Sequence, residues 1–244
     1  MLTKSWMTTA LLAVSAVVSG CSRPPSVSPV RLQLGLQYLV AGEYSAAERN
    51  LQRARLAAAE DYRPVLGLAR LYQAQGDNDE AAVWYTRAEE IAPENGYVLN
   101  NYGAFLCSLR QYDKAQSRFL AAMQADETGS RIQALLFSGR CFLDAGDTRQ
   151  AADSLSQAVV AENSAAGKLL EEAGRRLEQQ KFADTRLLLE IYHQQRSASA
   201  ESLWLKILYA ARQNATSDVK RYGDQLARVY PLSIQYQRYL ANEY

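Results

Sequence analysis

The fold is decided by the stretch from Gly96 to Met123, which reads GYVLNNYGAFLCSLRQYDKAQSRFLAAM. Its apolar spacing predicts two helices with a break near residues 110–112. Small residues at Gly103, Ala115 and Ala122 lie where the two helices would touch. Larger residues would fill the space beside them: Leu99, Tyr102, Leu106, Tyr112 and Phe119. The stretch therefore predicts one helical hairpin.

The same pattern recurs along the chain. Residues 34 positions apart match in four series: Gly35, Ala69 and Gly103; Ala47, Ala81 and Ala115; Leu51, Tyr85 and Phe119; and Ala54, Ala88 and Ala122. After two inserted residues the pattern resumes with Gly139, Gly146, Ala151, Leu155 and Ala158. A period of about 34 residues is the signature of tetratricopeptide repeats.

We therefore expect an all-α, right-handed superhelical solenoid of about six helical hairpins, with first helices on the concave face. The regular units are 28–61, 62–95, 96–131 and 132–165. Two degenerate units follow at 166–199 and 200–244, because terminal repeats expose one face to water and drift from the pattern.

Composition supports an ordered helical chain. The sequence is 48% hydrophobic and 22% charged, with few glycines (13) and prolines (6), which excludes a disordered chain and favours helices. The formal net charge of +1 gives no electrostatic reason to expect a nucleic-acid partner. We expect a monomer.

The N-terminus predicts a cleaved lipoprotein signal peptide over residues 1–20. An apolar run from Met7 to Val18 follows Lys4 and is too short to span a membrane comfortably. The run ends in VSGC, which resembles a bacterial lipobox with Cys21 as the lipidated residue. The alternative is an ordinary signal peptide that contains a cysteine. Residues 21–29 would form a lipidated, Pro- and Ser-rich tether.

The expected location is the periplasmic face of the outer membrane. Ser22, rather than Asp, follows the acceptor cysteine. By analogy with other bacterial lipoproteins, this residue favours the outer over the inner membrane. The membrane is thus expected as a partner through the lipid on Cys21.

The sequence predicts no enzyme. The single histidine, His193, has no cysteine or acidic cluster at ligand spacing, and no phosphate loop, nucleophile elbow or zinc motif is present. We expect no cofactor and no metal.

Cys107 and Cys141 occupy nearly matching positions on the first helices of units three and four. In an oxidising compartment they would form a disulfide that joins the two units. The alternative is two separate buried thiols, because neighbouring helix axes lie about 8–10 Å apart.

The concave groove is the expected binding site for a peptide or helix. In this repeat class the second, fifth, ninth and twelfth residues of a unit usually face it. The residues that we expect to line it are Leu32, Leu36, Leu39, Arg63, Leu66, Arg70, Asn100, Ala104 and Arg140. The apolar first unit favours an amphipathic partner helix or a C-terminal tail. Alternatively, these leucines pack under the tether or neighbouring helices.

The octad NNYGAFLC from Asn100 to Cys107, in a third repeat behind a lipobox, resembles type IV pilus biogenesis lipoproteins of the PilF/PilW family. The resemblance implies an outer-membrane pilotin of six repeats that supports localisation and multimerisation of secretin subunits. It also implies that Cys107 and Cys141 match two family cysteines. Ala104 departs from the family, which often has a bulky aromatic there.

Two other functions use the same groove. One is a lipoprotein subunit of the outer-membrane barrel-assembly machinery, against which the octad and the sixth hairpin argue. The other is an adaptor that recruits cell-wall enzymes.

Overall fold

The computed structural model describes residues 27–244, which form thirteen helices and no strand. Twelve helices form six consecutive hairpins. They are α1 (Val27–Val40), α2 (Tyr44–Ala57), α3 (Tyr62–Gln75), α4 (Asn78–Ile91), α5 (Gly96–Ser108), α6 (Tyr112–Ala122), α7 (Ser130–Ala145), α8 (Thr148–Ala161), α9 (Asn163–Glu178), α10 (Phe182–Gln195), α11 (Ala200–Arg212) and α12 (Thr216–Val229). The chain ends with α13 (Ile234–Leu240).

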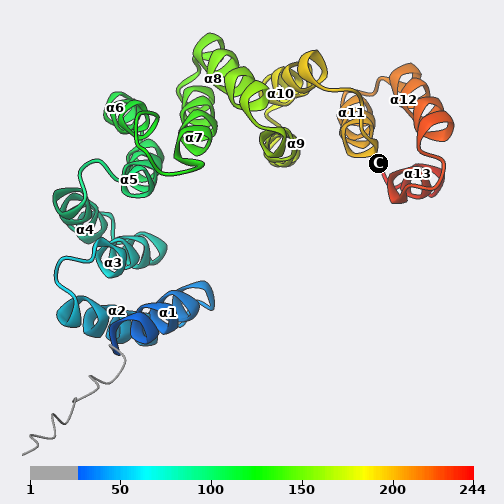
Figure 1. Cartoon of the computed structure of the whole chain (residues 1–244). Helices are drawn as coiled ribbons and strands as arrows, with labels where there is room; N and C mark the ends of the chain where they lie inside the picture. Colours follow the sequence, from blue (N-terminus) through cyan, green and yellow to red (C-terminus); the bar gives the residue numbers. More distant parts are fainter. Residues whose placement is uncertain (1–26) are drawn as a thin grey trace, which may run out of the picture.

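The hairpins stack into an arc. Figure 1 shows the odd-numbered helices on its inner side and the even-numbered helices on its outer side. Each first helix therefore faces the concave surface, as the repeat pattern predicts. The all-α tetratricopeptide solenoid expected from the sequence is confirmed.

The repeated small residues are the points of closest helix contact. A Cβ added at Gly103 would lie 2.6 Å from Phe119 Cε1, and one at Gly139 would lie 2.5 Å from Leu155 Cγ. The predicted core series are buried, with at most 1% of each side chain exposed: Ala47, Ala81, Ala115 and Ala151, then Leu51, Tyr85, Phe119 and Leu155. The 34-residue period is thus a packing requirement.

Glycine and aspartate form the turn within two of the hairpins. Gly76 has a φ of 80°, which a residue without a Cβ adopts without strain. The next residue, Asp77, accepts a hydrogen bond from the Glu80 backbone N–H at 3.2 Å and so caps α4. Gly146 and Asp147 repeat this arrangement before α8.

The predicted tether over 21–29 is too long at its C-terminal end. Helix α1 begins at Val27, so residues 27–29 are helical. Pro29 is compatible with this first turn, where backbone N–H groups have no acceptor within the helix. The predicted signal peptide and Cys21 lie outside the described residues.

Two first helices begin earlier than the predicted units. Helix α7 starts at Ser130 rather than 132, directly after Gly129, which has a φ of 80°. Helix α9 starts at Asn163 rather than 166, because Glu162 alone separates it from α8. These shifts follow from connection lengths, which the repeat period does not determine.

The predicted last unit, 200–244, contains a third helix. Helix α13 contacts both α11 and α12. A Cβ at Gly223 of α12 would collide with the Tyr239 ring of α13, so the two helices pack closely. Helix α13 therefore covers the end of the last hairpin, as a capping element does in a solenoid. None of the helices within residues 27–244 is long and apolar enough to cross a membrane.

Candidate functional site: the concave face

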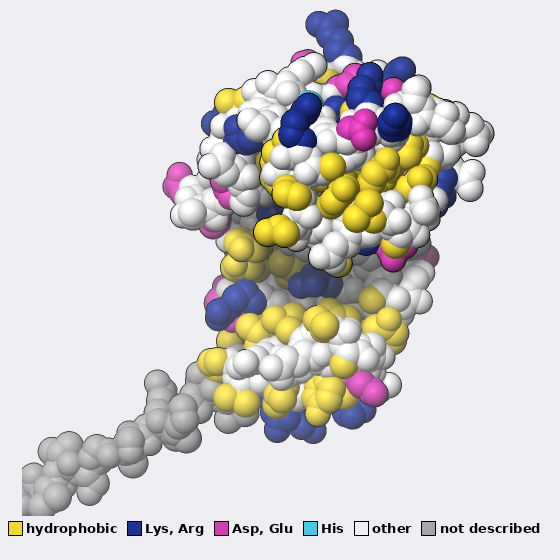
Figure 2. All heavy atoms as spheres, turned by 90° about the vertical axis from the view of Figure 1, so that its right-hand side faces the viewer, with side chains coloured by type: hydrophobic (Ala, Val, Ile, Leu, Met, Phe, Trp, Pro, Cys, Tyr) yellow, Lys and Arg dark blue, Asp and Glu magenta, His cyan; other side chains and the backbone are white. Residues whose placement is uncertain are grey.

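The N-terminal end of the concave face contains an apolar groove between α1 and α3. Its volume is about 560 Å³, and Pro29, Leu32, Gln33, Leu36, Gln37, Val40 and Arg63 line it. Val40 is 84% exposed and Leu36 is half-buried. Figure 2 shows hydrophobic side chains over the lower body, which contains α1. This groove can accept apolar side chains of another chain.

The predicted leucines differ in how much surface they offer. Leu32 is only 8% exposed and packs in the core with Leu51 and Leu68, although one side reaches the groove. Leu66 is 9% exposed within the next core cluster, and Leu39 packs partly against the first. The apolar groove surface therefore comes mainly from Leu36 and from Val40, which lies one residue beyond the predicted Leu39.

The prediction for Asn100 is wrong. Its side chain is fully buried, and its Nδ2 donates a hydrogen bond to the Ser130 carbonyl oxygen at 3.0 Å. Ser130 Oγ in turn donates to the Ala122 carbonyl oxygen at 3.0 Å. Helix α7 starts early and covers this position of α5, so Asn100 holds α7 instead of facing the groove.

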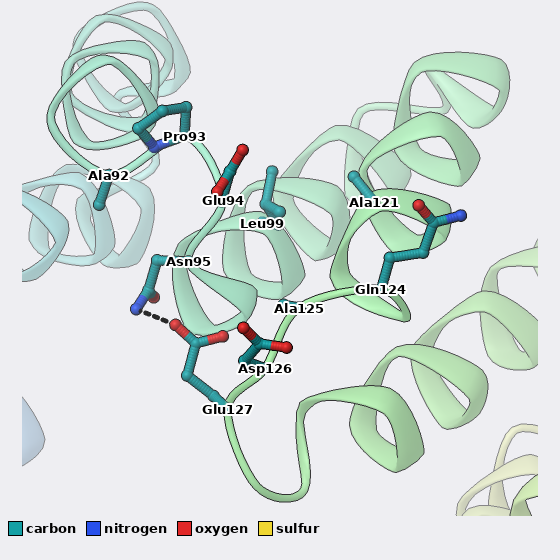
Figure 3. Close-up of a pocket in the computed structure, with 10 residues that line it drawn as sticks. All are labelled: Ala92, Pro93, Glu94, Asn95, Leu99, Ala121, Gln124, Ala125, Asp126 and Glu127. Atoms are coloured by element: carbon teal, nitrogen blue, oxygen red, sulfur yellow. Dashed lines mark hydrogen bonds between the residues drawn. The ribbon is translucent and has the colours of Figure 1, made fainter.

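The connection between α6 and α7 also fixes the start of α5. Figure 3 shows Glu127 pointing toward Asn95. Glu127 Oε1 accepts from Asn95 Nδ2 at 2.6 Å, and Oε2 accepts from the Gly96 backbone N–H at 2.9 Å. A negative charge at a helix N-terminus is stabilising.

A cavity of about 640 Å³ lies beside this connection. Ala92, Pro93, Glu94, Asn95, Leu99, Ala121, Gln124, Ala125, Asp126 and Glu127 line it. One of its three carboxylates, on Glu127, is hydrogen-bonded to the protein, and those of Glu94 and Asp126 are exposed. No group of three or more metal-binding side chains exists within residues 27–244. The cavity lies where the α4–α5 connection meets the α6–α7 connection.

The other predicted polar residues lie on the concave helices. Arg63 is exposed and forms an ion pair of 2.7 Å with Asp61, whose pKa its side-chain hydrogen bond lowers. Arg70 is exposed on α3, and Ala104 is half-buried on α5. Arg140 is half-buried on α7, and its guanidinium lies 4.9 Å from the centre of the Phe137 ring.

Sequence reasoning did not place four charged residues of α9 beside Arg140, which are Lys168, Glu171, Glu172 and Arg175. With Arg140 and hydrophobic neighbours they line a cavity of about 190 Å³ between α7 and α9. A signal was present, because Arg175 follows Gly174 as Arg140 follows Gly139. The drift of the fifth unit concealed this match.

Cys107 and Cys141 form a disulfide, with their Cα atoms 5.9 Å apart. This separation lies within the usual range for bridged cysteines. The bridge joins α5 to α7, the first helices of consecutive repeats. Cys107 follows Ala104 by three residues on α5, which is about one helical turn.

His193 of α10 lies in a separate cavity of about 500 Å³ between α10, α11 and α12. Its buried Nε2 has no hydrogen-bond partner, and burial, with a smaller effect of Lys206, lowers its pKa to about 4. The imidazole is therefore neutral near pH 7. Glu190 and Asp218 line the same cavity, but neither is hydrogen-bonded to its Nε2.

No family model matches this chain. The type IV pilus assembly protein PilF of Pseudomonas aeruginosa is 27% identical over 212 residues, which cover 87% of this chain and 84% of PilF. An uncharacterised protein of Haemophilus influenzae is 32% identical over 100 residues, which cover 41% of this chain and 56% of that protein.

Solved structures agree with this similarity. The structure of Pseudomonas aeruginosa PilF has a TM-score of 0.61 at 27% identity, covering 88% of this chain and 97% of PilF. The crystal structure of PilW, described as a widely conserved type IV pilus biogenesis factor, has a TM-score of 0.62 at 23% identity. It covers 89% of this chain and 100% of PilW. The chain is a PilF/PilW-like tetratricopeptide-repeat protein. The PilF/PilW resemblance noted in the sequence is therefore confirmed.

Proposed function

We propose that this protein is an outer-membrane lipoprotein that acts as a pilotin. It binds a subunit of the type IV pilus secretin in its concave groove and supports localisation and multimerisation of that secretin, hence pilus biogenesis. It binds rather than catalyses. Its lipid anchor is attached to Cys21 and holds the array at the periplasmic face of the membrane.

The observation that carries this proposal is the similarity to PilF along almost the whole array, at 27% identity over 87% of the chain. PilF is named as a type IV pilus assembly protein. A similarity restricted to one or two repeats would reflect the repeat pattern alone. Here it covers regular and degenerate hairpins alike, at matching chain length.

The α1–α3 groove gives the proposal a physical site. Val40 and Leu36 offer apolar surface, and Arg63 lies at its edge. Burying such surface against apolar side chains of an amphipathic segment favours binding by about 25 cal/mol per Å² before entropy costs. The segment would dock as a helix or an extended chain along the concave face.

The experiment is affinity capture from outer membranes of the native host, comparing wild type with Val40→Asp. Val83→Asp is the matched control, because Val83 is 60% exposed on the outer helix α4. We expect wild type and Val83→Asp to retain the secretin and Val40→Asp to lose most of it. Heat-resistant secretin multimers, measured by electrophoresis, should decrease in the Val40→Asp strain only.

Recovery of barrel-assembly or cell-wall-synthesis proteins without a secretin would contradict the pilotin proposal. Equal capture of the secretin by wild type and by folded Val40→Asp would contradict the groove assignment. Circular dichroism is the check that both variants are folded.

The anchor is tested separately with Cys21→Ser. We expect wild type to incorporate labelled palmitate and to fractionate with the outer membrane. The Cys21→Ser protein should incorporate none. Mass spectrometry that finds an unmodified Cys21 in the mature protein would refute lipidation.

A further inference from the structure

A cluster of cations lies on the concave face between repeats four and five. Arg140 comes from α7, and Lys168 and Arg175 come from α9. All three line one cavity of about 190 Å³, together with Gln133, Leu136, Phe137, Leu155, Leu169, Glu171 and Glu172. Lys168 and Arg175 are exposed, and Arg140 is half-buried, so a ligand can reach all three.

Three cations line the cavity, but only two carboxylates do, on Glu171 and Glu172. Glu172 is the buried carboxylate at its centre, only 2% exposed. Its Oε1 accepts from Arg176 Nε at 2.6 Å. Its Oε2 is the ion-pair partner of both Arg140, at 3.7 Å, and Arg175. Two guanidinium groups that face the cavity therefore share one carboxylate oxygen.

Two further acids, Asp144 and Asp184, pair with the buried Arg176. Asp144 Oδ1 and Asp184 Oδ2 lie 2.8 Å and 3.0 Å from Arg176 Nη1, and Asp144 also pairs with Lys181 at 3.4 Å. Arg176 is 4% exposed and directed away from solvent. These contacts pair the buried arginine within the protein. On the groove side, the three positive charges of Arg140, Lys168 and Arg175 exceed the two negative charges of Glu171 and Glu172 by one.

Arg140 is restricted by its neighbours in the protein. Its guanidinium stacks on Phe137, which restricts its rotation. Burial, followed by the charges of Arg175 and Arg176, lowers the pKa of Arg140 to about 10. It still carries its charge near pH 7, and a second carboxylate would relieve the repulsion between these guanidinium groups.

We propose that the cavity between α7 and α9 binds a carboxylate side chain of an acidic partner segment that passes along the concave groove. Arg140 and Arg175 would donate charge-assisted hydrogen bonds to it, and Lys168 would add a third cation. The proposal rests on the proposed function, since it specifies the chemistry of the partner bound in that groove.

The position in the array favours an acidic side chain over a chain terminus. The cavity lies between repeats four and five, and the concave face continues over α5 on one side and α11 on the other (Figure 1). Arg70 occupies the equivalent position on α3, after Ala69. A partner with apolar residues for the α1–α3 groove and acidic residues further along matches this surface.

The test measures binding of a labelled short peptide in which Glu alternates with Leu, acetylated and amidated at its ends. The probe is added to the mature protein and followed by fluorescence anisotropy. Arg140→Gln/Arg175→Gln should weaken binding by about tenfold or more. Lys168→Gln, which breaks no ion pair of the fold, should weaken it by about threefold. Arg149→Gln, on the outer helix α8, is the control and should bind as wild type.

Two further peptides identify the ligand chemistry. The same peptide with Gln in place of Glu should bind at least about tenfold more weakly. A Gln peptide with a free C-terminus should bind no better than its amidated form. If only the free terminus restores binding, the site recognises chain termini and the proposal is wrong.

Unchanged affinity in the folded Lys168→Gln and Arg140→Gln/Arg175→Gln proteins would overturn the proposal. This outcome is distinct from failure of the proposed function. Secretin capture that depends on Val40 but not on these cations leaves the pilotin role intact and refutes the carboxylate site. Conversely, peptide binding through the cations without secretin capture refutes only the pilotin role.

Discussion

The third hairpin, α5–α6, and the fifth, α9–α10, each have a glycine on the first helix, but the surroundings differ. At Gly103 an added Cβ would lie 2.6 Å from the fully buried Phe119 ring. At Gly174 the nearest atom would be Leu205 Cδ2, at an ordinary contact distance of 3.6 Å. The third hairpin requires its glycine for close packing, whereas the fifth does not.

The fifth hairpin contains buried ion pairs, whereas the third and fourth contain close helix–helix contacts at Gly103 and Gly139. Glu172 and Arg176, both under 5% exposed, pair with each other across one turn of α9 and reach α7 and α10. A buried ion pair adds little net stability but is costly to break. Loss of the repeat pattern therefore accompanies a change in the interactions between repeats, and this change creates the cationic side of the groove.

The largest expected effect concerns packing in the third hairpin. Phe119→Ala should lower the free energy of unfolding by about 3–5 kcal/mol, because it leaves a cavity at a fully buried position. Leu120→Ala, at the neighbouring 60% exposed side chain, should change it by less than about 0.5 kcal/mol. Urea denaturation followed by circular dichroism measures both. Equal effects would mean that Phe119 does not pack as described.

The second effect concerns the bridge between repeats three and four. Reduction of Cys107–Cys141, which are 34 residues apart, should destabilise the protein by about 4 kcal/mol on the loop-entropy model. Thermal unfolding with and without reductant measures the shift. Cys107→Ser/Cys141→Ser should melt near the reduced wild type and should not respond to reductant. Two free thiols in the non-reduced exported protein would refute the bridge.

The third prediction tests the two glycines directly. Gly103→Ala should destabilise by about 1–3 kcal/mol through overpacking against Phe119. Gly174→Ala should instead stabilise by about 0.5–1 kcal/mol, because alanine favours helices and meets only an ordinary contact. Denaturation midpoints of the two variants should therefore move in opposite directions. A shift of the same sign in both would remove the distinction between the hairpins.

The last prediction concerns how the stability of the protein depends on pH. His193, in the fifth hairpin, and Asp61, before α3, should act in different pH ranges. His193 has a folded pKa of about 4, below its ordinary 6.5, so the unfolded chain binds its proton first. Stability from this group is present above about pH 6.5 and falls as the pH decreases toward 4. The lowered pKa of Asp61 acts only below its ordinary 3.8. Between pH 7 and 4 the melting temperature of wild type should therefore fall more than that of His193→Gln, and parallel curves would contradict the buried neutral imidazole.

Sequence reasoning was most accurate for residues constrained by helix contact. Gly103, Ala115 and Phe119 form the predicted interface because only certain sizes fit between two helices at that distance. It was less accurate for the groove. Asn100 was assigned from its repeat position, but the early start of α7 buries it. Arg175 was missed because it belongs to a drifted repeat.

The sequence by itself determined the repeat, its period and the residues of each packing interface, because local helix geometry fixes which positions must be small or large. Only the tertiary structure decided which surface is available for binding. The early start of α7 buried Asn100, and packing against α2 and α3 buried Leu32. The same stacking brought Arg140 and Arg175 from different repeats to one cavity. Such contacts depend on the relative placement of helices, which no single repeat contains.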